Sequence, residues 1–177
     1  MMDKKIIIDK KELSIIIERL CYQLIEFHDD FSNTVLIGLQ PRGVFFARKI
    51  LEKLSKILAQ KEKIKYGELD STFFRDDFRR KKNVLKPQFT RIDFIIENKK
   101  VIIIDDVLYT GRSIRSSLDS LVTFGRPKKI ELLVLINRRF SRELPIEPKY
   151  IGKSVDVINY ERVIVDWETN NVLLLNK

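Results

Sequence analysis

Two adjacent carboxylates, Asp105 and Asp106, directly follow the apolar run Val-Ile-Ile-Ile at 101–104. A short apolar run rich in β-branched residues predicts a strand that is buried on both faces, as in parallel sheets. Open α/β sheets bind ligands at the carboxyl ends of such strands. We therefore expect the two acids to stand at a strand end and to hold the hydroxyl groups of a ligand.

A short loop at 109–113, Tyr-Thr-Gly-Arg-Ser, separates the acids from a helical pattern with apolar residues at 114, 118, 121 and 122. Small and hydroxyl residues that open a helix present free backbone N–H groups at the positive end of its dipole, which suits a phosphate. Acids beside such a cradle suggest a sugar phosphate. Taken alone, the same pattern also fits an ordinary helix cap and turn.

A second strand-loop-helix unit begins at Thr34. The run 34–38 predicts a strand, a loop with Gln40, Pro41, Arg42 and Gly43 follows it, and a helix is expected from Val44 to about Lys61. Glycine permits close approach of the backbone to a ligand, and arginine suits phosphate oxygens. Alone this is an ordinary turn with a solvated arginine; beside the 101–113 motif we favour an anion-binding loop.

The rest of the chain predicts one α/β domain over residues 1–177, with a central, mainly parallel sheet flanked by helices. An amphipathic helix is expected over 10–28, where Asp9 and Glu12 have capping-box-like spacing. Further strands are expected at 6–8, 64–74, 92–97 and 130–136, a helix from 113 that stops at Gly125, and a C-terminal hairpin at 162–167 and 172–175.

Two loops are expected to complete a cleft over the sheet. The segment 75–91 is long and basic, with Arg75, Arg79 and Arg80, and long loops in compact domains are often lids. The segment could be a flexible lid that closes over pyrophosphate or simply a solvated loop, and the sequence leaves both interpretations open. The segment 137–145 follows a predicted strand and would form the remaining wall.

Composition limits the classes of function. The chain has 177 residues, 33% charged and 44% hydrophobic, which fits a globular protein rather than a disordered one. No apolar run approaches the roughly 20 residues of a membrane span. The only histidine, His28, is expected to interact with the dipole of its helix, and the only cysteine, Cys21, to be a buried thiol. Histidine-based triads and zinc clusters are excluded, and we expect a cytoplasmic protein. The formal net charge of +9 allows an anionic ligand or nucleic acid.

The 13 residues from Val101 to Ser113 resemble the phosphoribosyl pyrophosphate (PRPP) motif of type I phosphoribosyltransferases. Six runs, in this order, make the resemblance narrower: Tyr66-Gly67-Glu68-Leu69-Asp70, Phe74-Arg75-Asp76-Asp77, Asp105 to Arg112, Gly125-Arg126-Pro127, Arg142-Glu143-Leu144-Pro145-Ile146 and Tyr150-Ile151-Gly152-Lys153. Together they resemble the pyrimidine operon attenuation regulators, which are also uracil phosphoribosyltransferases. The resemblance implies a type I phosphoribosyltransferase fold and transfer from PRPP to uracil, giving UMP and pyrophosphate. It also implies a homodimer or larger homo-oligomer and, in many members, UMP-dependent binding to mRNA leaders.

The resemblance also assigns roles to residues. Asp105, Asp106 and Arg42 would be catalytic, and Mg²⁺ would bind through PRPP near the two acids, without a certain protein ligand. The PRPP site would comprise Asp105, Asp106, Val107, Leu108, Tyr109, Thr110, Gly111, Arg112 and Ser113; the pyrophosphate loop, Gln40, Pro41, Arg42 and Gly43; and the nucleobase wall, Asn137, Arg138, Arg139 and Phe140. Many phosphoribosyltransferases carry an acid where this chain has Tyr109, so no general base is named.

Three departures from the family pattern concern the base and RNA. Pro41 replaces a threonine, Glu18 and Tyr22 replace a threonine and a histidine of the RNA-facing helix, and Phe140-Ser141 alters the nucleobase wall. These changes remove donors, and Glu18 adds a negative charge, so we expect only non-specific RNA binding. Two alternatives stay open: an RNA-binding regulator that keeps the nucleotide pocket as a sensor, and a phosphoribosyltransferase for another base.

Overall fold

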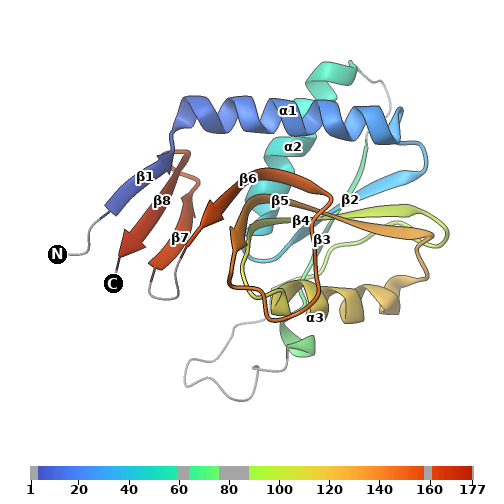
Figure 1. The fold of residues 1–177 in the computed structure, drawn as a ribbon. Coiled ribbons are helices and arrows are strands. Elements are labelled where there is room, and N and C mark those ends of the chain that lie inside the picture. Colours follow the sequence, from blue (N-terminus) through green and yellow to red (C-terminus); the bar gives the residue numbers. More distant parts are fainter. Residues whose placement is uncertain (1–3, 60–63, 76–87, 158–160, 177) are drawn as a thin grey trace.

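The computed structural model describes residues 4–59, 64–75, 88–157 and 161–176. Its centre is a five-stranded sheet of order β3-β2-β4-β5-β6, in which every neighbouring pair is parallel. The strands are β2 (Thr34–Leu39), β3 (Lys65–Leu69), β4 (Lys100–Leu108), β5 (Lys129–Arg139) and β6 (Tyr150–Asp156). The helices α1 (Lys10–His28) and α2 (Gly43–Leu58) cover one face, and α3 (Arg112–Leu121) covers the other (Figure 1). The predicted α/β fold with a central parallel sheet between helices is thus confirmed.

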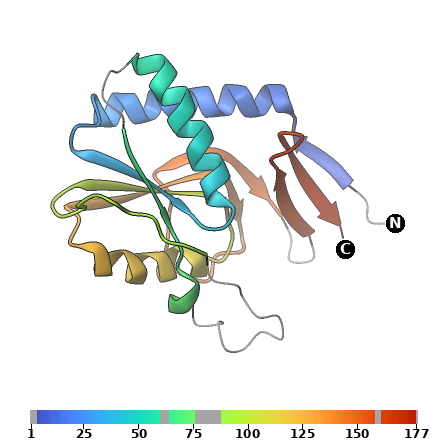
Figure 2. The same ribbon diagram turned by 180° about the vertical axis from the view of Figure 1, so that it is seen from behind.

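A second, antiparallel sheet of order β1-β8-β7 lies beside the first, and both ends of the chain are close to it (Figures 1 and 2). Its strands are β1 (Lys4–Ile8), β7 (Glu161–Asp166) and β8 (Asn171–Asn176). The predicted C-terminal hairpin is therefore present, and the N-terminal strand adds to its edge. No helix in the described part of the chain is long and apolar enough to cross a membrane.

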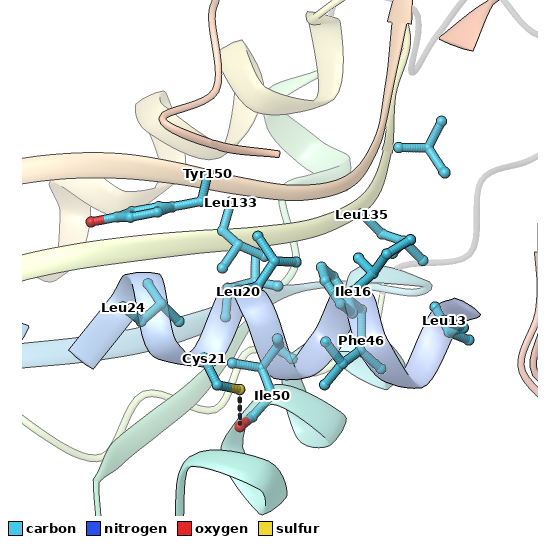
Figure 3. Packing of buried hydrophobic residues seen from close by; sticks show 14 of the residues in the cluster. Leu13, Ile16, Leu20, Cys21, Leu24, Phe46, Ile50, Leu133, Leu135 and Tyr150 are labelled. Atoms are coloured by element: carbon cyan, nitrogen blue, oxygen red, sulfur yellow. Dashed lines mark hydrogen bonds between the residues drawn. The ribbon is translucent and has the colours of Figure 1, made fainter. Parts of the chain in front are cut away.

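The larger core packs α1 and α2 against the sheet (Figure 3). The side chains at its centre are fully or almost fully buried: Leu13, Leu20, Cys21 and Leu24 of α1, Phe46 and Ile50 of α2, and Leu133 and Leu135 of β5. Burying an aliphatic side chain contributes about 1.5–3 kcal/mol, so this layer fixes the position of the sheet. The Cys21 thiol lies 3.7 Å from the Ile50 carbonyl oxygen, and burial raises its pKa to about 12. Cys21 is thus a buried structural thiol, as predicted.

Several predicted boundaries are wrong. Segment 92–97 forms no strand: its neighbour Arg91 makes only an isolated bridge to Glu68, and Ile95 is 73% exposed. Strand β3 stops at Leu69, a 3₁₀ turn (Thr72–Phe74) follows, and α2 stops at Leu58. Strand β6 was not predicted, because its glycine and charged residues hide the apolar pattern. Strand β4 runs on to Leu108 because it pairs with β5 as far as Asn137, and β5 runs on to Arg139 because it pairs with β6 as far as Asp156.

Candidate active site

A cleft of about 250 Å³ opens where β4 passes into α3. It is lined by Arg75, Asp105, Val107, Leu108, Tyr109, Thr110, Gly111, Arg112, Ser113 and Ile114. Eight of the nine residues that the sequence assigned to a PRPP site therefore share one cavity; Asp106 is the exception. This edge holds the carboxyl ends of the parallel strands, where α/β sheets bind ligands.

The two acids lie inside β4 and not after its end, contrary to the prediction. Because successive strand residues point to opposite faces, Asp105 lines the cleft while the Asp106 carboxylate accepts a hydrogen bond from Nε of Arg42 at 2.9 Å. Burial raises the pKa of both carboxyl groups; the Asp106 charge raises that of Asp105 further, and Arg42 partly offsets the rise at Asp106. A hydroxyl-bearing or cationic ligand would relieve this unfavourable pair.

The loop from Tyr109 to Ser113 turns at Gly111, whose φ of 92° is in the left-handed region that favours glycine. Gly111 is the N-cap of α3 and offers no side chain to cap the helix, and the Arg112 N–H makes a long hydrogen bond of 3.4 Å to the Thr110 hydroxyl. A helix N-terminus of this kind suits a phosphate group. The far side of the loop is held by the N–H groups of Glu143 and Leu144, which both donate to the Thr110 carbonyl. Arg75 donates to Ser113 Oγ at 2.9 Å and closes the near side.

The second predicted loop lies directly against the acidic strand. A Cβ on Gly43 would lie 2.6 Å from the Ile104 carbonyl oxygen and 2.9 Å from the Cα of Asp105, so only glycine fits there without a shift. Arg42 also donates to the Val165 carbonyl of β7, and about half of its side chain is exposed. The Gln40–Pro41 peptide bond is cis. The predicted pyrophosphate loop and the acids thus meet at one place.

The expected nucleobase wall divides into two parts. Asn137, Arg138 and Arg139 belong to β5 and not to a loop, contrary to the prediction. The Arg138 side chain is buried, its guanidinium lies 4.1 Å from the centre of the Tyr109 ring, and its Nε and Nη2 have no hydrogen-bond partner among the described residues. Burial lowers the pKa of Arg138. In contrast, Arg139 is held by both Asp156 oxygens at 2.6 and 2.7 Å, and Phe140 is 83% exposed.

Arg142 is a residue of this region that the sequence did not single out for the site. Its guanidinium donates to the Tyr109 carbonyl at 2.5 Å and to the Asn137 side chain at 2.6 Å, so it joins the 109–113 loop to β5. Its place in the Arg-Glu-Leu-Pro run could have drawn attention to it. Of the expected lid residues, Arg75 lines the cleft, whereas Arg79 and Arg80 lie outside the described residues.

The described residues contain no group of three or more side chains suited to hold a metal ion. Asp105, which lines the cleft, nevertheless supplies the hard carboxylate oxygen atoms that Mg²⁺ prefers, and Mg²⁺ commonly completes its shell with ligand phosphates and water. The site therefore fits a Mg²⁺ ion that arrives with a phosphorylated ligand. Phosphoribosyltransferases generally use Mg²⁺ in this way.

A carboxylate and a helix-opening loop that share one cleft at the carboxyl end of a parallel sheet, with a second loop packed on the same strand, are the arrangement of a phosphoribosyltransferase. The family model for the phosphoribosyl transferase domain matches residues 4–167, and the chain belongs to this family.

Within that family, the chain is similar over its whole length to proteins named bifunctional protein PyrR. It is 40% identical to that of Streptococcus mutans over 180 residues, covering 99% of this chain and 98% of the relative. It is 42% identical to that of Elusimicrobium minutum over 162 residues, covering 90% of this chain and 88% of the relative. Among solved structures, hypoxanthine phosphoribosyltransferase of Trypanosoma cruzi has the same fold, with a TM-score of 0.74, 16% identity, and coverage of 97% of this chain and 96% of that chain.

Proposed function

We propose that this chain transfers the phosphoribosyl group of PRPP to uracil, giving UMP and pyrophosphate. The observation that carries the proposal is the placement of Asp105 in one cleft with the Thr110–Ser113 loop, while the Arg42 loop packs on the same strand. Full-length similarity to the PyrR relatives supports the pyrimidine as acceptor.

In the proposed reaction the bond from ribose C1 to pyrophosphate breaks, and a bond from C1 to a ring nitrogen of uracil forms while that nitrogen loses its proton. Asp105 would hold the ribose hydroxyls and the Thr110–Ser113 loop the 5′-phosphate, so that C1 is oriented for attack. Arg42, already half exposed and fixed by Asp106, would stabilise the departing pyrophosphate. Bound Mg²⁺ would supply further positive charge to the pyrophosphate.

Arg138 is the residue that we assign to the base. Buried guanidinium N–H groups without partners cost free energy, and a carbonyl oxygen of a nucleobase would satisfy them. The guanidinium also lies 4.1 Å from the centre of the Tyr109 ring, and this cation–π contact helps to hold it in place. Uracil offers two such carbonyl groups, although other bases with carbonyl groups share this chemistry.

A screen of the purified protein with PRPP, Mg²⁺ and a panel of bases tests the proposal. We expect formation of UMP with uracil and at least tenfold slower turnover with hypoxanthine, guanine and adenine. Faster turnover with a purine would mean that the purine, and not uracil, is the substrate. No turnover with any base would contradict the enzymatic function.

A second candidate function is regulation of pyrimidine genes by binding to mRNA. The relatives are named bifunctional proteins, and they align with 99% and 90% of this chain. In this alternative UMP, the product of the transfer, would be the sensed ligand, whereas Glu18, Tyr22, Pro41 and Phe140 favour RNA binding that does not respond to UMP. Binding of the chain's own pyrimidine-gene leader RNA, with and without UMP, tests it.

We also propose a homodimer as the smallest assembly. Exposed apolar side chains at Ile6 and Phe45, 55% and 49% exposed, lie at the small sheet and at the start of α2, and contact with a second copy would bury them. Sedimentation equilibrium of the purified protein would show a mass of twice 21.0 kDa, or a multiple of that mass.

A further inference from the structure

Glu68 on β3 has a buried carboxylate that is surrounded by donors, although it lines no part of the described cleft. Its Oε2 accepts a hydrogen bond from the side-chain amide of Gln40 at 2.9 Å. Its Oε1 accepts hydrogen bonds from Arg48 Nη2 at 2.6 Å and from the Tyr66 hydroxyl at 3.0 Å. A buried carboxylate needs such partners, and here they come from three different elements.

The donors are divided between the two oxygens. Arg48 supplies the positive charge that compensates the carboxylate and shares Oε1 with Tyr66. Gln40 is the only donor recorded on Oε2 among the described residues. Oε1 is therefore held by Arg48 and Tyr66, and Oε2 accepts from Gln40, the first residue of the predicted pyrophosphate loop.

The main chain of Glu68 is fixed on both sides. Strand β3 pairs with β2, where Glu68 is opposite Gly38, and on its other edge Glu68 exchanges two backbone hydrogen bonds with Arg91, at 2.9 and 2.7 Å. The Glu68 side chain is therefore attached to a main chain that is fixed on both edges. A hydrogen bond from a rigid carboxylate can determine the orientation of a loop.

The loop from Gln40 to Gly43 is held at its two ends by different strands. At its start, the Gln40 N–H donates to the Leu69 carbonyl of β3 at 2.9 Å, and the Gln40 side chain is held by Glu68. At its end, Gly43 touches β4 and Arg42 is hydrogen-bonded to Asp106. Without Glu68, the start of the loop would keep only one backbone bond.

We propose that Glu68 is a positioning residue for pyrophosphate: its carboxylate fixes Gln40 and thereby sets the direction in which the Arg42 loop meets the ligand. This inference rests on the proposed phosphoribosyl transfer, in which the loop binds the leaving group. Glu68, in the Tyr-Gly-Glu-Leu-Asp run, would thus affect ligand binding through Gln40 without touching the ligand itself.

Glu68→Gln tests the proposal, because its single carbonyl oxygen stays with Arg48 and Tyr66 and its NH2 group then faces Gln40, which loses the charged acceptor that fixes the orientation of its side chain. We expect the dissociation constant of inorganic pyrophosphate, measured by calorimetry with Mg²⁺ and no base, to rise about tenfold. The KM for PRPP should rise by a similar factor, whereas the KM for the base should change less than twofold. Tyr66→Phe is the matched control, since it removes a donor from the same carboxylate but spares Gln40; pyrophosphate affinity should stay within about twofold.

A double-mutant cycle with Gln40→Leu separates positioning from general stability. Glu68→Gln should add less than twofold to the loss caused by Gln40→Leu, whereas independent additive losses would overturn the proposal. Unchanged pyrophosphate affinity in Glu68→Gln would overturn it too. If Glu68→Gln does not fold, Glu68→Asp replaces it. Aspartate keeps the charge but is one methylene shorter, and we expect the same rise in the dissociation constant of pyrophosphate.

The readout also separates this inference from the proposed function. Because pyrophosphate binding is measured without a base, a wild-type protein that binds pyrophosphate but does not use uracil would refute the uracil assignment and leave the Glu68 test intact. A wild-type protein that binds no pyrophosphate would overturn both.

Discussion

At the scale of single residues, the site holds a carboxylate pair that weakens the free protein. Burial and the neighbouring Asp106 charge raise the pKa of Asp105, so its ionised form is unfavourable in the folded state. When the pKa of a carboxyl group is higher in the folded than in the unfolded state, the folded state is favoured while the group is protonated. This contribution to the free energy of unfolding is lost as pH rises through the folded-state pKa. The acids thus cost stability in the free protein, as is common for residues that are kept for function.

Asp105→Asn should therefore separate activity from stability. We expect transfer to fall roughly ten- to a hundredfold, because a charged hydrogen bond to the ribose is lost. The variant should be more stable than the wild type at pH 8 by about 1 kcal/mol, which raises Tm by roughly 2–4 °C. Activity assays and calorimetry measure the two effects.

Asp106→Asn should cut transfer by a similar factor, because Asp106 fixes Arg42. Asp119→Asn, in an exposed pair with Arg115 on α3, is the control and should change neither quantity. Wild-type turnover in a double variant of Asp105 and Asp106 would refute the site assignment.

A second charged cluster lies away from the site, at the end of α1. His28 is buried at the helix terminus, where a dipole interaction was expected, but its ring also contacts Thr34, Glu131 and Tyr150 at 2.8–3.0 Å. Burial lowers the pKa of His28. Burial alone would raise the pKa of Glu131, yet hydrogen bonds from Lys129, Lys149 and Tyr150 outweigh it and lower the pKa to about 2.

Both shifts favour the fold at neutral pH and oppose it in acid. A lowered His28 pKa means that stability is lost as pH falls below about 6.5, when the unfolded chain takes up the proton; the Glu131 contribution is lost from about pH 4.5 down to about 2. Glu131→Gln should thus lower the free energy of unfolding by about 2–3 kcal/mol at pH 7, and by less at pH 3. Urea unfolding at both pH values measures this. An equal loss at both would contradict it.

At the scale of elements, helix α2 must approach β4 closely for the two loops to meet. Gly43→Ala should push α2 away from β4, because the new Cβ would lie 2.6 Å from the Ile104 carbonyl. We expect a loss of roughly 1–3 kcal/mol in stability and at least a tenfold rise in the KM for PRPP. Ser55→Ala, at an exposed position of the same helix, should change neither, which calorimetry and kinetics can check. Unchanged kinetics in Gly43→Ala would contradict the close approach.

The elements that the sequence predicted well are those with a strong local signal. The continuous apolar run before Asp105 predicted a buried strand, and the helical period of residues 10–28 predicted α1; the helix was placed correctly, and the strand was found although it extends past the acids. The strand expected at 92–97 is absent because Ile96 packs into the core on the α3 side of the sheet without strand pairing, while Ile95 stays exposed.

Local patterns could not show where strands end or which side chains meet. Asp105 and Asp106 were predicted at a strand end, because the continuation of β4 depends on pairing with β5, a contact between distant segments. The Glu68–Gln40 contact spans 28 residues, and the Arg142–Tyr109 contact 33, so neither leaves a local trace.

At the scale of the whole molecule, net charge and the α1 surface bear on RNA. The formal charge of +9 gives attraction to phosphates that weakens steeply with salt. Arg19 is engaged with the carbonyl oxygens of Ile151 and Gly152, and Glu18 lies 3.1 Å from Lys53. The helix therefore offers RNA fewer free donors than its sequence suggests, although the Glu18 charge is partly compensated.

We therefore expect RNA binding that is weak, sensitive to salt and insensitive to UMP. Specific recognition needs side chains that read unstacked bases or loop shape, and Glu18, Tyr22, Pro41 and Phe140 replace or alter family residues there. In protein–DNA recognition a lost specific contact is worth roughly 1–3 kcal/mol against a typical specificity margin of about 4–10 kcal/mol. Titration against the chain's own pyrimidine-gene leader RNA, near physiological salt with and without UMP, measures this, and a scrambled RNA is the control. Nanomolar affinity that UMP strengthens and the scrambled RNA lacks would contradict the prediction and would mean that this surface has been rebuilt for a different set of contacts.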